Sequence, residues 1–498
     1  MKKTKGSDSY SHVIKYTGLF GGIQGLNILV SIVRNKLVAL LLGPDGMGLI
    51  SLFNSTVKLV SDSTNLGISM SAVKNISEAY DSDDSSRLNH TICIVRFWSL
   101  IVAVLGMLLM LMLSPLLSKL TFSYGGLTIH YICLSPVVAF IAITGGESAI
   151  LKGTRHLSGL AFASVLNVMG AFLVSVPLYY LFGMSAIVPT LLLLALVQMV
   201  ITLSYSLRFY PLSFSYDRIL LKEGAGMVRL GVAFVMAGIL GSGAEFVIRT
   251  FLNIVGSTSD VGLYNAGYMM TMTYAGLVFS AMESDYFPRL SAVGDSVLKL
   301  NETVNRQVEV TLLLISPMLV AFMISLPILL PLLYSGMFMP ALGMIQVMTL
   351  ALYARALTLP IEYVTLAKGD SRSYLFLEAI YDIMLVIMAY LGFSQWKLFG
   401  MGVAVTVTSI LNVILVYAYS YFKYGYRMSS NVLMYMMIHI PVGCLAYAVT
   451  IFNSPLIYWG VGTMLFIVSL SSSLSILRSK TSLWNKLKER YASKFLRK

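Results

Sequence analysis

Apolar residues fill the chain in long runs, and short polar stretches separate one run from the next. A run of about 20 apolar residues crosses the hydrocarbon core of a bilayer as a helix. The pattern therefore predicts an all-α polytopic membrane protein with about fourteen transmembrane helices. The expected spans are 17–42, 47–73, 91–114, 128–151, 157–182, 185–207, 229–255, 261–282, 309–334, 342–366, 374–392, 398–422, 431–452 and 456–477.

The charges indicate how these helices are oriented. Only 11% of residues are charged, and most of the 35 Lys and Arg residues fall in the two tails and in every second gap between apolar runs. Short loops rich in Lys and Arg stay cytoplasmic, so we expect both termini in the cytoplasm. The net charge of +13 is then a topology signal and gives no reason to expect nucleic acid binding. The first run is too long for a signal peptide, and we expect it to remain as the first helix.

Residue types that carry out chemistry are scattered. The three cysteines and five histidines are far apart, and the chain has no HExxH, P-loop, GxSxG or paired-cysteine motif. We therefore expect no enzyme active site, no metal site and no cofactor.

Two six-helix blocks resemble each other where the first helix of each block ends. Residues 30–50 read VSIVRNKLVALLLGPDGMGLI, and residues 245–265 read EFVIRTFLNIVGSTSDVGLYN. Each stretch has an Arg, an Asp eleven residues later, and then Gly-Leu. Chance similarity is the alternative to a duplication. An even number of helices per block predicts parallel repeats, which commonly enclose a cavity.

From this repeat we predict a chain of five parts. They are a cytoplasmic tail at 1–16, six-helix lobes at 17–215 and 216–424, a two-helix hairpin at 425–477, and a basic tail at 478–498.

Polar side chains recur at helical spacing inside several apolar spans. Residues three or four apart share one face of a helix, and an uncompensated charge at mid-bilayer costs roughly 2.5–3.5 kcal/mol. Two interpretations follow. The charges form pairs (Lys58 with Asp62, Arg249 with Glu245, Arg355 with Glu362), or they line a shared aqueous cavity, which the recurrence favours. The candidate binding residues are Gln24, Asn27, Arg34, Asn54, Lys58, Asn65, Arg249, Tyr353 and Arg355, with Asp62, Glu245 and Glu362 as charge partners.

The net charge of the residues that line such a cavity indicates the charge of its ligand. Guanidinium groups match the oxygens of phosphate in geometry and charge, so a cationic cavity favours an anionic ligand, whereas an exporter of organic cations needs the opposite sign. Glu378 and Asp382 are four residues apart on the eleventh span. They either bind a coupling cation or proton, or form the solvated inner end of that helix.

Residues 21–79 resemble the Wzx-like polysaccharide-transport flippases of the multidrug/oligosaccharidyl-lipid/polysaccharide exporter superfamily. The specific parts are LLGPDGMGLISLF followed by NLGIS. The later helices match mainly in hydropathy and length, together with YNAGY at 264–268 and YFPRLSA at 286–292.

The resemblance implies alternating access by two six-helix lobes plus two extra helices. It also implies the substrate, an oligosaccharide on polyprenyl pyrophosphate such as an O-antigen repeat unit of lipopolysaccharide. The flippase moves this lipid from the cytoplasmic to the periplasmic leaflet of the bacterial inner membrane. Cationic residues line the cavity in similar proteins, and here Arg34, Lys58 and Arg249 take those positions. Unlike the related drug exporters, this chain has no acidic residue within helix one.

Membrane lipids are expected partners, and the polysaccharide polymerase and other assembly proteins are further candidates. Two other functions stay open at this point. One is a cation-coupled multidrug exporter of the same fold, and the other is a non-transporting scaffold of a glycan assembly complex.

Overall fold

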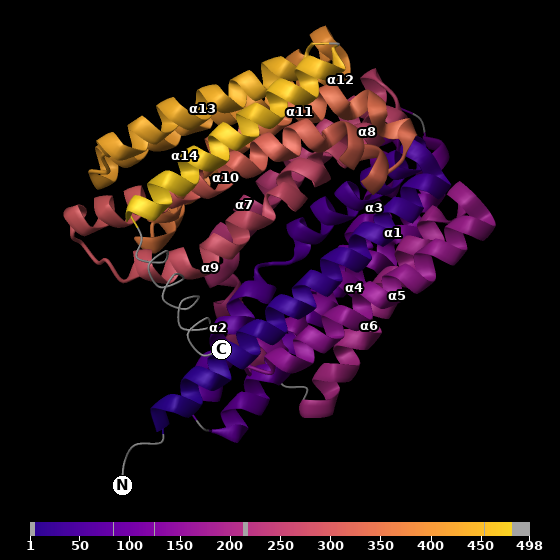
Figure 1. The fold of residues 1–498 in the computed structure, drawn as a ribbon. Helices are drawn as coiled ribbons and strands as arrows, with labels where there is room; N and C mark the ends of the chain where they lie inside the picture. Colours follow the sequence, from indigo (N-terminus) through magenta and orange to yellow (C-terminus); the bar gives the residue numbers. More distant parts are fainter. Residues whose placement is uncertain (1–4, 83, 124, 213–217, 453, 481–498) are drawn as a thin grey trace, which may run out of the picture. The chain divides into compact units, whose positions relative to one another are not determined.

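The structure is a computed structural model that describes residues 5–82, 84–123, 125–212, 218–452 and 454–480. The side chains of 5–24, 69–70, 157, 218–234, 280–281 and 283–284 lie outside this description. Within these ranges every regular element is helical (Figure 1), which confirms the predicted all-α class. The basic tail expected at 478–498 lies outside the described residues from 481 onward.

The helices follow the apolar runs and are joined by short turns. The long elements are α1 (Lys5–Thr64), α2 (Ile68–Asp81), α3 (Ser85–Phe122), α4 (Thr128–Gly153), α5 (Leu157–Phe182), α6 (Ile187–Phe209), α7 (Arg218–Val255), α8 (Thr258–Tyr268), α9 (Leu277–Ser291), α10 (Val297–Leu333), α11 (Leu342–Ala367), α12 (Ser371–Tyr424), α13 (Ser430–Thr450) and α14 (Gly462–Lys480). The short helical turns between them are η1 (Gly125–Leu127), η2 (Gly183–Ala186), η3 (Met269–Ala275), η4 (Gly336–Ala341) and η5 (Ile457–Val461).

Two of these helices are interrupted by non-helical residues. In α1 the break is Gly43, whose φ of 64° suits glycine and which precedes Pro44. In α12 the break lies at Trp396 and Lys397. Each of these elements therefore contains two helical segments, as the sequence pattern predicts.

Ten helical stretches in the described ranges are long and apolar enough to cross a membrane, so the chain is a multi-pass membrane protein. Three of them, at 25–64, 158–209 and 371–424, have 40, 52 and 54 residues. One crossing takes about 20 residues, so each has room for two crossings. The total of about fourteen stays a prediction.

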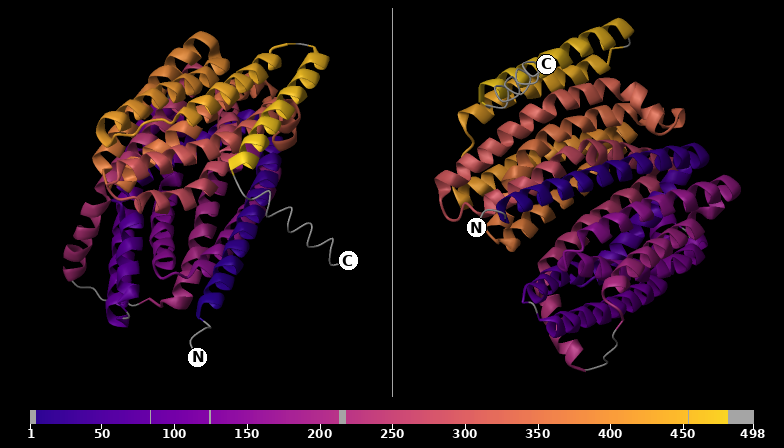
Figure 2. Two further views of the ribbon diagram at one scale, coloured as in Figure 1. Left: turned by 60° about the vertical axis from the view of Figure 1, so that its left-hand side comes forward. Right: turned by 60° about the horizontal axis from the view of Figure 1, so that its bottom comes forward.

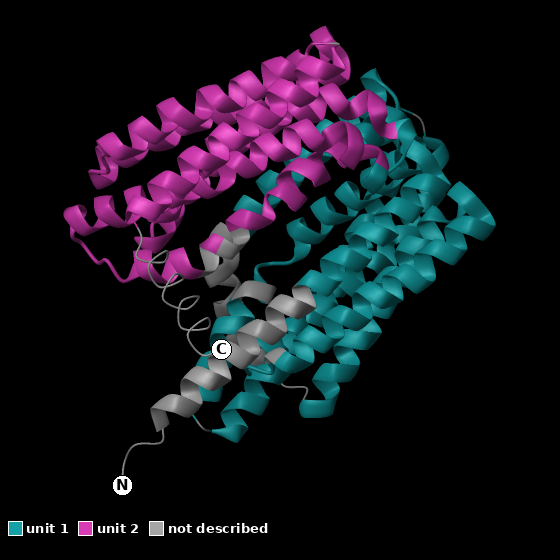
Figure 3. Ribbon diagram, viewed as in Figure 1, with its two compact units in different colours: residues 1–263, 332–337 teal, residues 264–331, 338–498 magenta. Residues whose placement is uncertain are grey.

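The chain divides into two compact units (Figure 3). The first compact unit comprises residues 1–263 and 332–337, and the second comprises residues 264–331 and 338–498. Helix α7 therefore groups with the helices that precede it, whereas the sequence pattern assigns it to the second lobe. The predicted lobes and hairpin stay a prediction.

Within the first compact unit, α3 packs along α4, α4 and α5 pack on α6, and α1 contacts both α5 and α7. Within the second, α11 packs along α12, and α13 lies beside α14 (Figures 1 and 2). A large buried cluster of this second unit gathers residues of α9 to α13 and of the turn between α12 and α13, among them Tyr286, Tyr353 and Tyr426.

Candidate functional site

The second segment of α1 and the helix α7 meet through polar side chains in an antiparallel register. Ser51 contacts Arg249, and Lys58 contacts Glu245. Asp62, one turn further along α1, interacts with Ser242. The residue numbers of the contacts increase along α1 and decrease along α7. The contacts therefore form successive rungs between two neighbouring helices. We call these six residues the polar ladder.

Glu245 is the centre of the polar ladder because its carboxylate binds two cations. Its Oε1 lies 3.2 Å from Nζ of Lys58, and its Oε2 lies 3.1 Å from Nη1 of Arg249. Arg249 also donates from Nε to Oγ of Ser51 at 2.8 Å and from Nη1 to the backbone oxygen of Glu245 at 3.3 Å. The guanidinium is therefore held on two sides, by its own helix and by α1.

Exposure differs sharply along the polar ladder. The side chain of Arg249 is 8% exposed, that of Glu245 is 29% exposed, and that of Lys58 is 52% exposed. Arg249 is thus a fixed and buried cation, whereas Lys58 can reach a ligand without disturbing the helix packing.

Counting formal charges in the polar ladder gives two cations, Lys58 and Arg249, and two acids, Glu245 and Asp62. Lys58 and Glu245 both interact electrostatically with Asp62. The excess of positive charge expected from the sequence is therefore not present in this group of residues. The cations are instead matched by carboxylates of the protein itself.

The polar stripe of the first helical segment of α1 contacts α5. Arg34 donates from Nε to Oγ of Ser175 at 3.0 Å, and Asn27 donates from Nδ2 to Oγ of Ser164 at 2.8 Å. Asn27 is buried. The side chain of Gln24 lies outside the described residues.

Two amides predicted for binding lie on the second segment of α1 or just after it. Asn54 is exposed and lies one helical turn before Lys58, on the same face. Asn65 directly follows the end of α1 and is half-buried.

The second compact unit contains a separate polar group around Arg355 of α11. The Arg355 guanidinium lies 5.5 Å from the ring centre of Phe279, and its Nη1 lies 3.8 Å from Sδ of Met272. Glu362 accepts a hydrogen bond from Nδ2 of Asn412 at 2.8 Å and interacts electrostatically with Glu378 and Arg355.

Two further predicted residues of the second unit are buried. Tyr353 belongs to its hydrophobic core and donates to the backbone oxygen of Ser316 at 3.3 Å. Asp382, on α12, is also buried. Tyr353 therefore contributes packing in this conformation.

The structure also shows a buried ion pair that the sequence reasoning did not identify. Arg96 of α3 binds both carboxylate oxygens of Glu147 of α4, at 2.9 and 3.2 Å, and the two side chains are 10% and 5% exposed. Arg96 also donates to the backbone oxygens of Tyr210 and Pro211, at 2.9 and 3.1 Å. The sequence feature that could have identified this ion pair is the presence of opposite charges inside two neighbouring apolar runs.

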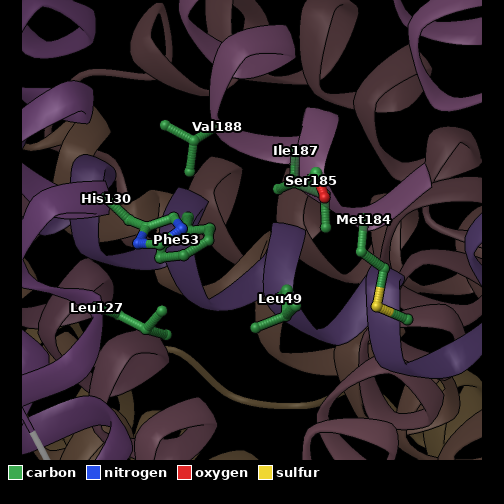
Figure 4. A pocket seen from close by; sticks show the side chains of 8 residues that line it. All are labelled: Leu49, Phe53, Leu127, His130, Met184, Ser185, Ile187 and Val188. Carbon is green, nitrogen blue, oxygen red and sulfur yellow. The ribbon is translucent and has the colours of Figure 1, made fainter. Parts of the chain in front are cut away.

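A small pocket of the first compact unit does not match the size of an oligosaccharide (Figure 4). Its volume of about 70 Å³ is enough for roughly two water molecules. The His130 ring lies nearly parallel to that of Phe53, with centres 6.2 Å apart. The other lining residues are Leu49, Leu127, Met184, Ser185, Ile187 and Val188.

Several solved transporters have the same fold. The fold is similar to that of the lipid II flippase MurJ in an inward closed conformation, with a TM-score of 0.72 and 13% identity over 93% of this chain and 99% of that one. An inward-facing MATE family multidrug resistance transporter of the MOP superfamily gives a TM-score of 0.68 and 16% identity over 80% of this chain and 94% of that one. Identities this low show a shared fold and leave the substrate open.

The sequence comparisons are more specific about the family. No curated protein sequence matches the chain. Residues 37–342, which include all six residues of the polar ladder, match the family model described as polysaccharide biosynthesis protein. The chain therefore belongs to the polysaccharide biosynthesis protein family and has the fold of MOP superfamily transporters.

Proposed function

We propose that the protein is a flippase for a polyprenyl-pyrophosphate-linked oligosaccharide, the repeat unit of a surface polysaccharide such as O-antigen. It moves this lipid from the cytoplasmic to the periplasmic leaflet of the bacterial inner membrane by alternating access, with both of its own termini in the cytoplasm. The family supports the link to polysaccharide synthesis, and the fold supports transport.

The observation that carries the proposal is the double pairing of Glu245. Its two oxygens each bind one cation, Lys58 on one side and Arg249 on the other. A pyrophosphate presents anionic oxygens of the same kind and with more charge, and both cations bind phosphate well. Glu245 thus occupies the place that we assign to the pyrophosphate, and it keeps the cations paired while no substrate is bound.

The remaining assignments follow from the exposure and contacts of each residue within its own compact unit. Asn54 is exposed on the same face as Lys58, and we assign it and Asn65 to sugar hydroxyls. Arg34 and Asn27 donate hydrogen bonds to serines of α5. If they bind substrate, the substrate must replace these serines as the acceptor. Glu362, Glu378 and Asp382 are proposed to bind the coupling ion, with Arg355 as their counter-charge.

A multidrug exporter is the second candidate, and one observation favours it. The polar group of the second unit has a single cation, Arg355, beside the acids Glu362 and Glu378. An acidic environment of this kind suits an organic cation. Expression of the protein in cells tests this candidate directly, because an exporter raises resistance to cationic dyes and a flippase does not.

Flipping by the purified protein in proteoliposomes tests the main proposal. The liposomes contain a polyprenyl-pyrophosphate oligosaccharide, and a membrane-impermeant probe reads the sugar on the outer leaflet. Wild type should translocate it, and Arg249→Gln should lose most of this activity. Arg289→Gln is the matched control, because Arg289 forms an ion pair of the same i, i+4 spacing with Asp285 at 2.7 Å but is 51% exposed. No translocation above empty liposomes by folded protein with its native sugar would refute the proposal.

A further inference from the structure

Two glycines at one end of the polar ladder allow direct contact between backbones. A Cβ built on Gly48 would lie 1.9 Å from the backbone oxygen of Thr258. A Cβ built on Gly262 would lie 1.9 Å from the backbone oxygen of Pro44. All four residues belong to the first compact unit. Neither position has room for a methyl group unless the two segments move apart.

The two contacts are reciprocal. Thr258 precedes Gly262 by four residues, and Pro44 precedes Gly48 by four residues, so each glycine packs on the carbonyl four positions before the other glycine. Both glycines belong to the Asp-containing motif that recurs at 30–50 and 245–265. The two copies of the repeated motif therefore meet each other at the glycines of their Gly-Leu pairs, although Gly48 follows Asp45 by three residues and Gly262 follows Asp260 by two.

This contact continues the polar ladder beyond its Ser51–Arg249 rung. In the topology expected from the loop charges, the end of the first span lies on the outer side of the membrane, and so does the end of the seventh. Contacts between a glycine Cα and a carbonyl oxygen are worth only about 0.5–1 kcal/mol each. Backbone atoms are the nearest neighbours at both glycines, and the Thr258 methyl lies 3.0 Å from the Cβ built on Gly48, so separation of the two segments breaks mainly backbone contacts.

We propose that the reciprocal glycine contact is the outer closure of the transport path, and that it opens once in each cycle to release the substrate. This inference rests on the proposed function for its direction of transport. It adds the place at which the path is sealed, and it assigns the close backbone contacts at Gly48 and Gly262 a purpose in the cycle rather than in stability alone.

Labelling of a cysteine behind the contact tests the proposal. The three native cysteines are replaced by serine, and Ser51→Cys, at a position only 5% exposed, is the reporter for a membrane-impermeant maleimide added from outside. Gly48→Ala and Gly262→Ala should each speed its labelling about tenfold, which corresponds to a shift of about 1.4 kcal/mol toward the open form. The controls are Gly25→Ala and Gly238→Ala, where nothing lies within 4 Å of the added Cβ, and they should leave the rate unchanged.

Equal labelling of all four alanine variants would overturn the proposal, and so would a response to only one of Gly48 and Gly262. If these two variants do not fold, the intact glycines still give a test. Asp45→Cys, at an exposed position, should then be labelled at least about tenfold faster than Ser51→Cys, and equal rates would overturn the closure. Labelling requires no transport. Normal flipping with unresponsive labelling would therefore refute the closure alone, and responsive labelling without flipping would refute the proposed function alone.

Discussion

Replacement of Glu245 by Gln removes the charge that holds both cations of the polar ladder and keeps the size of the side chain. If Glu245 occupies the place of a pyrophosphate, the substrate competes with it for Lys58 and Arg249. Glu245→Gln should then bind substrate more tightly than wild type. A carboxylate that takes part in transport directly would give the opposite result, so the sign of the change decides between the two roles.

The magnitude follows from the exposure of the two pairs. The Lys58 pair has a half-exposed cation, and such pairs contribute about 0.2–1 kcal/mol. The Arg249 pair has a cation that is 8% exposed, and hydrogen bonds to charged groups contribute about 1.5–3 kcal/mol. The amide of Gln keeps part of the second interaction. A net gain of about 1.4 kcal/mol, or tenfold in affinity, is the expected result.

The assay is the substrate concentration at half-maximal flipping in proteoliposomes, compared with direct binding in detergent. Asp285→Asn is the matched control, because Asp285 forms the same i, i+4 pair with Arg289 but is 75% exposed. This control should leave the affinity within about twofold of wild type, as expected for an exposed ion pair. Unchanged or weaker binding by Glu245→Gln would refute the counter-ion reasoning, and loss of flipping at every substrate concentration would assign Glu245 to ion coupling instead.

Two further predictions concern stability. Arg96→Leu should lower the free energy of unfolding by about 3–5 kcal/mol because it leaves Glu147 buried without its partner. The double variant Arg96→Leu, Glu147→Leu should recover most of this loss. Denaturant unfolding in detergent measures the stability of both variants. At the turn before α12, Lys423 at 2.6 Å lowers the pKa of the Asp370 carboxyl, with further hydrogen bonds from Ser373 and Tyr424. Its stabilisation is present above the unfolded pKa of about 3.9 and is lost as the pH falls through the lower folded value. Asp370→Asn should therefore cost about 0.2–1 kcal/mol at neutral pH and progressively less in acid, and an equal cost at pH 7 and pH 2 would contradict this.

Helical spacing identified one ion pair of the polar ladder and missed the partner of another cation. The spacing of Arg249 and Glu245 offers an ion pair one turn apart as an alternative to a shared cavity, and the structure contains this pair. The same spacing pairs Lys58 with Asp62, but Lys58 binds Glu245, which is 187 residues away. Helical periodicity determines which side chains share a face, whereas the neighbour of that face depends on tertiary packing.

The polar stripe of helix one shows the same limit. Its spacing correctly groups Asn27 and Arg34 on one face of α1, and this face contacts Ser164 and Ser175 of α5. Serines in an apolar helix are too common to identify such partners in advance. The contacts of Gly48 and Gly262 were still harder to predict from the sequence, because only the structure shows that the two copies of the repeated motif touch each other.

Charge sign alone is a weak guide to the ligand of this protein. Summed over the polar ladder the formal charges cancel, so the total does not separate a carrier of pyrophosphates from an exporter of cations. In the proposed function, the distribution of these charges separates the two. Among the four charged members, the most exposed is the cation Lys58, and the most buried, Arg249, is also a cation, while Glu245 binds both. In the proposed function, a ligand that reaches Lys58 gains the Arg249 guanidinium only by displacing the Glu245 carboxylate, so the proposal requires an anionic ligand.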